Sequence, residues 1–279
     1  MSQYICRLKL QLRQTFPQYL KLFSKVNTIT SLEILSHYPS PDSILSADKE
    51  TLISLIQTSA HKGRKTAEQK YELLCQAAND AAYFGHGNDG NYILIGHYVE
   101  MIRILTAQTE SLLDKVKCIL ADNPESSLTR QIDLIQSIPG AGFITAATIA
   151  CEIGDFTQFK KPKQLYAYFG LDPKVRQSGN YNGNEQHISK RGSSFARRAI
   201  YMMAIQSISN NKSGVPKNSV LRDYYIQKCI SKPKMTAVGA VMHKLCNIIF
   251  AVLRDEAPFK IITPDEHRRN HSQIIMTAA

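Results

Sequence analysis

Apolar positions repeat at helical spacing along most of the chain, so we predict a mainly α-helical protein. In the first part of the chain the repeats stop where proline or polar residues gather. They predict helices over residues 5–16, 20–26, 31–38, 49–59 and 66–83. We expect Ser46 to be the N-cap of the helix over 49–59. A break rich in glycine, asparagine and aspartate follows at residues 85–91.

A long helix is predicted next, from about Tyr92 to Ala121. Its apolar residues fall on one side at mixed spacings of three and four, which is typical of helices in a bundle or a short coiled coil. They are Ile95, Val99, Ile102, Leu105, Leu112, Leu113, Val116 and Ile119. We therefore expect a homo-oligomer that forms through residues 92–121.

The polar stretch at residues 122–127 is the best candidate for a linker. We therefore predict a helical or coiled-coil region over residues 1–127, an α-helical domain over 128–260 and a polar tail over 261–279. The most apolar window of the second domain, residues 235–253, is interrupted by His243, Lys244 and Asn247. A membrane span rarely accepts such residues, so we predict a buried helix and no membrane partner.

Charge separates the two regions more sharply than hydropathy does. The chain has a net charge of +11, yet residues 1–130 hold 14 Lys and Arg against 13 Asp and Glu. Residues 131–279 hold 20 against 10. A field of one sign disfavours the compact state unless an anion is bound. Nucleic acid suits this field because each cation placed on a phosphate releases counterions. A solvated basic face is the alternative interpretation.

The six cysteines lie far apart and show no metal-ligand spacing, which excludes a zinc site and a disulfide framework. We expect buried, reduced thiols. The first residues carry Arg7, Lys9 and Arg13 among their apolar positions, unlike a secretory signal. We therefore expect a cytoplasmic, nucleoid-associated protein.

The most distinctive local motif is Ser-Ile-Pro-Gly-Ala-Gly-Phe at residues 137–143. Pro139 would end one helix, and Gly140 and Gly142 would allow a tight turn into the next, so we predict a helix-hairpin-helix. Amides at the start of the second helix would favour a phosphate. Such contacts hold DNA without reading its sequence. An ordinary helical turn is the alternative.

A polar, glycine-rich loop is predicted over residues 173–184, before a basic helix that opens near Ser193. Ser178 lies in this loop within a cationic field supplied by Arg176, Lys190, Arg191 and Arg197. A serine hydroxyl needs a base or a stabilised alkoxide to act as a nucleophile, and guanidinium groups could bind the phosphate under attack. From the residues alone, binding of a phosphate backbone is the simpler interpretation. The preceding Tyr166, Tyr168 and Phe169 are expected in the core rather than stacked on bases.

Carboxylates are too few in the second region for a two-metal nuclease, so we predict no metal ligand. A helix-hairpin-helix glycosylase would need a catalytic aspartate in an apolar pocket some 20 residues past the hairpin. Asp155 comes too early and Asp172 too late. That alternative is disfavoured.

Five motifs together resemble a known family: residues 137–147, 152–156, 165–173, 176–179 and 188–201. Their order and spacing are similar to the C-terminal domain of insertion-sequence transposases of the one-ten family. These are the DEDD-plus-serine recombinases related to the Piv invertase. The resemblance covers residues 128–259, and the first 127 residues are similar to the family's helical coiled-coil linker.

The resemblance implies that Ser178, in the Ser178-Gly179 pair, is the catalytic nucleophile of a transposase or site-specific recombinase. DNA is then the expected partner, and some family members also use a guide RNA. The expected DNA-binding residues are Gly140, Gly142, Arg176, Gly179, Lys190, Arg191, Arg197 and Arg198.

Family members pair this domain with a RuvC-like domain whose four acids bind Mg²⁺, and residues 1–127 show no such pattern. We therefore expect no cofactor in this chain, with Mg²⁺ needed only alongside a RuvC-like domain. The competing hypothesis is a catalytically inert DNA- or RNA-binding remnant of a transposase.

Overall fold

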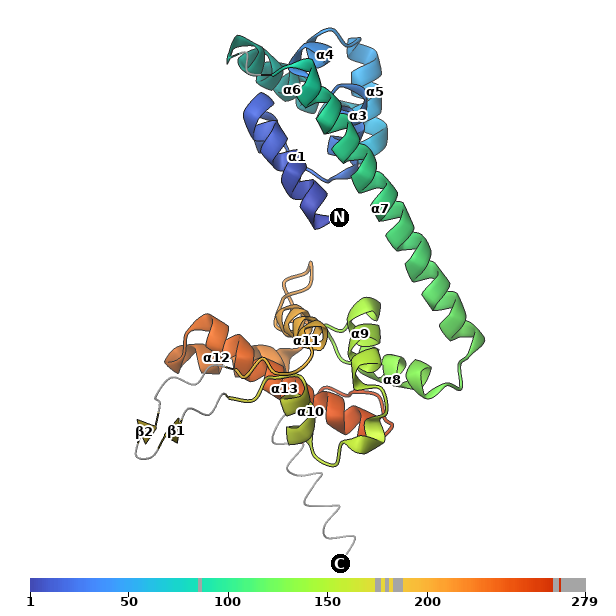
Figure 1. The fold of residues 1–279 in the computed structure, drawn as a ribbon, viewed down its shortest axis with the longest axis vertical. Coiled ribbons are helices and arrows are strands. Elements are labelled where there is room, and N and C mark those ends of the chain that lie inside the picture. The colour runs from blue at the N-terminus through green and yellow to red at the C-terminus, as the bar shows by residue number, and fades with distance from the viewer. Residues whose placement is uncertain (85–86, 174–176, 179–180, 183–187, 263–265, 267–279) are drawn as a thin grey trace, which may run out of the picture. The chain divides into compact units, whose positions relative to one another are not determined.

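The computed structural model describes residues 1–84, 87–173, 177–178, 181–182, 188–262 and 266. The protein is mainly α-helical, as predicted (Figure 1). The chain forms two compact units, residues 1–119 and 120–279, which we call unit 1 and unit 2. The division falls a few residues before the predicted linker, near the end of the long helix.

Unit 1 is a bundle of helices of unequal length. α4 and α5 pack on α6, and α3 packs on α5. The core is almost entirely aliphatic and aromatic, so burial of apolar surface holds this unit together. The helices are α1 (Ser2–Thr15), α2 (Tyr19–Leu22), α3 (Ile29–His37), α4 (Pro41–Leu45), α5 (Lys49–Ala60), α6 (Arg64–Phe84) and α7 (Asp89–Asp122).

The cap of α5 differs from the prediction. Asp48 is the N-cap, and its Oδ2 atom accepts a hydrogen bond from the Thr51 amide at 2.9 Å. The expected cap, Ser46, instead ends α4, and its hydroxyl donates to the Asp42 carbonyl at 2.9 Å. The sequence pattern missed α4, a short helix that begins with the capping residue Ser40 and with Pro41.

The apolar stripe of α7 is buried along only part of its length. Ile95, Val99 and Ile102 belong to the core of unit 1. Further along the same stripe, Leu112 and Ile119 are each 62% exposed. The apolar face of this helix therefore continues beyond the part that unit 1 covers.

Unit 2 is built around α13, on which α8, α10, α11 and α12 pack. α9 packs on α8 and α11. The elements are α8 (Ser127–Gln136), α9 (Phe143–Ile153), η1 (Phe156–Gln158), α10 (Pro162–Tyr168), β1 (Gln177–Ser178), β2 (Tyr181–Asn182), α11 (Ser194–Ser207), α12 (Ser219–Ser231) and α13 (Lys234–Arg254). β1 and β2 pair antiparallel inside the segment that was predicted as a loop.

Helix α13 confirms the predicted buried helix. Among the described residues it alone is long and apolar enough, by length and composition, to cross a membrane. However, 56% of its most apolar window is buried inside the protein. Its inward residues include Val241, Leu245 and Ile249, which are fully buried in the core of unit 2.

The expectation of buried cysteines holds for one of the six, because Cys75 and Cys229 are only half-buried and three others are exposed. Cys246 on α13 is buried, and desolvation raises the pKa of its thiol far above the ordinary value. Cys6, Cys118 and Cys151 are exposed instead. Each lies in a mostly apolar stretch of sequence, but helical periodicity turns it to the solvent side.

Candidate nucleic-acid interface

The predicted hairpin motif joins α8 to α9 through residues 137–142. Gly140 has a φ of +107°, so glycine is required here for conformational reasons. A Cβ atom at Gly140 would also lie 2.6 Å from the backbone nitrogen of Ser207. The Ser207 hydroxyl donates to the Pro139 carbonyl at 2.7 Å. Gly140 therefore packs the turn closely against the end of α11.

The other glycine of the motif faces solvent. Gly142 is the N-cap of α9, is exposed and has no side chain that could cap the helix. The first amides of a helix have no partner within the helix. The first turn of α9 can therefore offer N–H groups, together with the positive end of the helix dipole, to an anion.

A second feature lies on the connection between α10 and α11. Two short backbone segments, residues 169–173 and 188–192, face one another there. We call these residues the neck. Gly170, with a φ of +66°, and Gly192 lie against one another. A Cβ atom on Gly192 would lie 1.7 Å from the Tyr168 carbonyl oxygen. The glycines allow the two sides of the neck to approach more closely than any side chain would permit.

Hydrogen bonds link the two sides of the neck. The Ser189 amide donates to the Asp172 carbonyl at 2.7 Å, and the Ser189 hydroxyl donates to Asp172 Oδ1 at 2.5 Å. The Lys190 amide donates to the Gly170 carbonyl at 3.0 Å. This bond holds Lys190 at a φ of +57°, a left-handed conformation that costs about 1–2 kcal/mol for a side chain with a Cβ atom.

Of the five cations predicted around this region, the four that the structure describes have different environments. Lys190, Arg191 and Arg198 have exposed side chains. Arg197 is half-buried, and its Nη1 atom donates to the carbonyls of Phe169 at 3.1 Å and Gly192 at 3.3 Å. Three of these cations are thus open to a solvent-borne anion, whereas Arg197 is bonded to the neck.

The segment between the two sides of the neck contains the predicted nucleophile. Ser178 lies in β1, and its backbone pairs with Tyr181 of β2. The Ser178 side chain, Arg176 and Gly179 lie outside the described residues. Figure 1 shows β1 and β2 on the connection between α10 and α11.

The three aromatic residues of segment 166–169 only partly follow the prediction that they lie in the core. Phe169 is fully buried, and Tyr166 packs against the core of unit 2. Tyr168 is 45% exposed, with its ring centroid 5.3 Å from that of Phe159. A helix turns about 100° per residue, so Tyr168 does not share the direction in which the adjacent Phe169 is buried.

The acidic residues that the structure describes in unit 2 do not form a metal-binding cluster. Hydrogen bonds from the hydroxyl and amide of Thr157 lower the pKa of Asp155, which is exposed and caps η1. Asp172 is engaged with Ser189 in the neck. Neither is an acid in an apolar pocket, which counts against the glycosylase alternative. Within the described ranges, no group of three or more His, Cys, Asp and Glu residues could hold a metal ion. The described residues therefore do not provide a carboxylate site that fits Mg²⁺.

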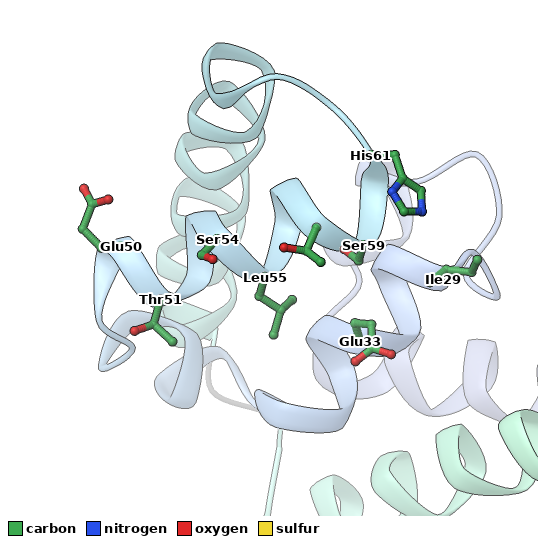
Figure 2. Close-up of a pocket in the computed structure, with 9 residues that line it drawn as sticks. Ile29, Glu33, Glu50, Thr51, Ser54, Leu55, Ser59 and His61 are labelled. Atoms are coloured by element: carbon green, nitrogen blue, oxygen red, sulfur yellow. The ribbon is translucent and has the colours of Figure 1, made fainter.

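The two most pronounced grooves of the described surface have more acidic than basic residues in their lining. A groove of about 740 Å³ lies between α3 and α5 in unit 1, where Glu33 and Glu50 accompany hydroxyl groups and His61 (Figure 2). A groove of about 640 Å³ in unit 2 is lined by four acidic residues, Glu125, Asp133, Asp155 and Glu256, and by Arg130, which is paired with Glu125. Neither suits a phosphate, and neither contains a predicted DNA-binding residue.

The fold and these residues define a class of protein. It is a helical protein whose second unit has exposed cationic side chains and an uncapped helix N-terminus. Residues 132–225 match the sequence pattern of the Transposase IS116/IS110/IS902 family. The resemblance predicted from the motifs is confirmed.

Known relatives agree with this family match. An insertion element IS110 uncharacterized protein of Streptomyces coelicolor is 23% identical over 80% of this chain and 51% of its own length. The transposase for insertion sequence element IS1111A of Coxiella burnetii is 28% identical over 60% and 46%. The pilin gene-inverting protein of Moraxella bovis is 32% identical over 49% and 41%. The chain spans about half the length of these relatives or less.

Proposed function

We propose that this chain supplies the DNA-holding and serine-bearing part of an enzyme of DNA transposition or site-specific recombination. The family match over residues 132–225 carries the proposal, because it contains the neck and the segment with Ser178. The names of the relatives, a transposase and a gene-inverting protein, point to the same class of reaction. The basic balance of the second unit supports an anionic polymer as substrate.

DNA would be held through its backbone. The exposed side chains of Lys190, Arg191 and Arg198 supply positive charge around the neck. The amides of the first turn after Gly142 supply neutral donors aligned with a helix dipole. Both kinds of contact recognise phosphate and carry no sequence information.

Ser178 is proposed as the nucleophile. Its hydroxyl proton passes to a base, its Oγ atom bonds to a DNA phosphorus, and the bond from that phosphorus to the departing strand breaks. The oxygen of the departing strand takes up a proton. The phosphodiester is thereby conserved as a serine–DNA ester, so attack by a strand hydroxyl can rejoin DNA without an external energy source. Cations near the phosphate would stabilise the charge that develops during attack.

A homo-oligomer would form through α7. The helix has a heptad pattern with Ile95, Ile102, Thr109 and Val116 at the a positions and Tyr98, Leu105, Leu112 and Ile119 at the d positions. Ile95 and Ile102 are buried in unit 1, so pairing would use the later positions. β-branched residues at a, with leucine frequent at d, favour a parallel two-stranded coiled coil. The exposed last turns of this stripe supply apolar surface for such a pairing.

The experiment that tests the serine role searches for the covalent ester in cells carrying the whole genomic locus of this chain. The chain is recovered under denaturing conditions, treated with nuclease and analysed by mass spectrometry for a nucleotide on the peptide containing Ser178. The proposal predicts the modified peptide in the wild type and its loss in Ser178→Ala. A matched Ser213→Ala variant, at an exposed loop position, keeps the modification. Absence of the ester in the wild type, with DNA binding intact, supports the inert remnant instead.

A further inference from the structure

Arg197 differs from its neighbour Arg198 in what its guanidinium contacts. Arg198 is exposed, whereas Arg197 directs Nη1 at carbonyl oxygens on both sides of the neck, Phe169 on one and Gly192 on the other. A guanidinium is planar, always charged and rich in donors, so it can hold two carbonyls in a fixed relation. A lysine ammonium has rotatable donors and no planar fork, so it would not fix the angle between the two carbonyls.

The same short piece of backbone is tied to the core at a further point. His243 of α13 contacts the Leu171 carbonyl through Nε2 at 2.7 Å, and a carbonyl only accepts, so Nε2 is the donor. The Tyr166 ring lies against the His243 ring, with the centroids 4.8 Å apart. The neck is therefore anchored to α11 by Arg197 and to α13 by His243.

The two sides of the neck are joined to one another as well. Ser189 donates a backbone and a side-chain hydrogen bond to Asp172, and Pro173 pairs with Ile188 as an antiparallel bridge. These bonds act on both ends of the segment that contains Ser178. Whatever conformation that segment takes, its two ends leave the core at positions set by Arg197 and by the Asp172–Ser189 pair.

We propose that Arg197 is a positioning residue that sets the place of the Ser178 segment, with the Asp172–Ser189 pair as its partner across the neck, and that it is not a ligand of DNA. This inference rests on the proposed function. A nucleophile displaced by about 1 Å from its target can lose on the order of a hundredfold in rate, so a small loosening of the neck is expected to suppress chemistry before it weakens binding.

The test measures DNA binding and the chemical step separately. The purified chain is titrated with a mixed-sequence DNA duplex to obtain Kd, and the Ser178–nucleotide adduct per molecule of chain is measured in cells carrying the locus. Arg197→Gln is expected to lower the adduct yield about tenfold or more, with Kd within about twofold of the wild type. Lys212→Gln, which removes one exposed cation from the same unit, is the matched control and is expected to change neither quantity.

A second pair of variants keeps the proposal falsifiable if Arg197→Gln fails to fold. Ser189→Ala removes the hydroxyl that donates to Asp172 and is expected to lower the adduct yield. Ser189→Thr keeps a hydroxyl at this position and is expected to give the wild-type yield. Normal adduct yield in a folded Arg197→Gln chain, or a raised Kd as its main defect, overturns the inference and leaves the proposed function standing. Equal losses in Ser189→Ala and Ser189→Thr also overturn it. No adduct in the wild type overturns the serine role itself and the inference with it.

Discussion

Gly192 shows how one residue of the family motif is fixed by packing. Its Cα faces the Tyr168 carbonyl so closely that a methyl group has no space, and the obstacle is backbone rather than a flexible side chain. Gly192→Ala should therefore force the two sides of the neck apart. We expect a loss of about 2 kcal/mol or more in the free energy of unfolding of unit 2.

Gly239, inside α13, is the matched comparison, because nothing lies within 4 Å of a Cβ atom built there. Gly239→Ala should stabilise the protein by about 0.5–1 kcal/mol, since alanine loses less backbone entropy in a helix. Urea denaturation followed by circular dichroism measures both variants. If both variants change the free energy of unfolding equally and in the same direction, the close approach at the neck is not what restricts position 192 to glycine.

Asp48 gives a prediction about pH. Hydrogen bonds from the Thr51 amide and hydroxyl lower the pKa of this carboxyl below its ordinary value of 3.8 in the folded state. Its contribution to stability is therefore present above pH 3.8 and is lost as the pH falls through the lower folded-state pKa. Asp48→Asn keeps an acceptor for the cap but removes the titration. We expect the difference in Tm between wild type and variant to shrink as the pH falls below 3.8, and a constant difference would contradict this.

At the scale of the element, helix α7 could be predicted nearly in full from the sequence, because its heptad pattern is local. The burial of Ile95 and Ile102 and the exposure of Leu112 could not be predicted, because they depend on how far the other helices of unit 1 reach. The same limit applies to the neck. The bond from Ser189 to Asp172 joins residues 17 positions apart, and no spacing rule for helices or strands indicates it.

The exposed part of α7 gives a prediction about assembly. Leu112→Lys places a charge at a d position of the proposed coiled coil and should shift sedimentation velocity profiles toward monomer. Its midpoint of thermal unfolding as a monomer should hardly change, because Leu112 is not part of the core of unit 1. Ser111→Lys, one position away at c, adds the same charge to the opposite face and should leave the oligomer intact. A wild-type chain that is monomeric at high concentration would contradict the coiled coil.

At the scale of the whole molecule, composition indicated the chemistry of the proposed partner, but it did not indicate which residues are proposed to meet that partner. Charge balance depends only on counting, and the excess of cations in the second region was evident. The different environments of Arg197 and Arg198 could not be predicted from the sequence, in which the two residues are neighbours. They depend on the turn of α11 relative to the neck, a contact between residues 28 positions apart.

The most direct test of the account measures how salt weakens binding of the purified chain to a mixed-sequence DNA duplex. The slope of log Kd against log salt concentration counts phosphates neutralised, at about 0.9 per contact. The account predicts that Lys190→Gln with Arg191→Gln reduces this slope by about 2, since both side chains are proposed to meet the backbone. Lys21→Gln with Lys25→Gln removes the same charge from unit 1 and should leave the slope unchanged. Equal slopes for the two double variants, or no measurable binding by the wild type, would contradict a DNA interface at the neck.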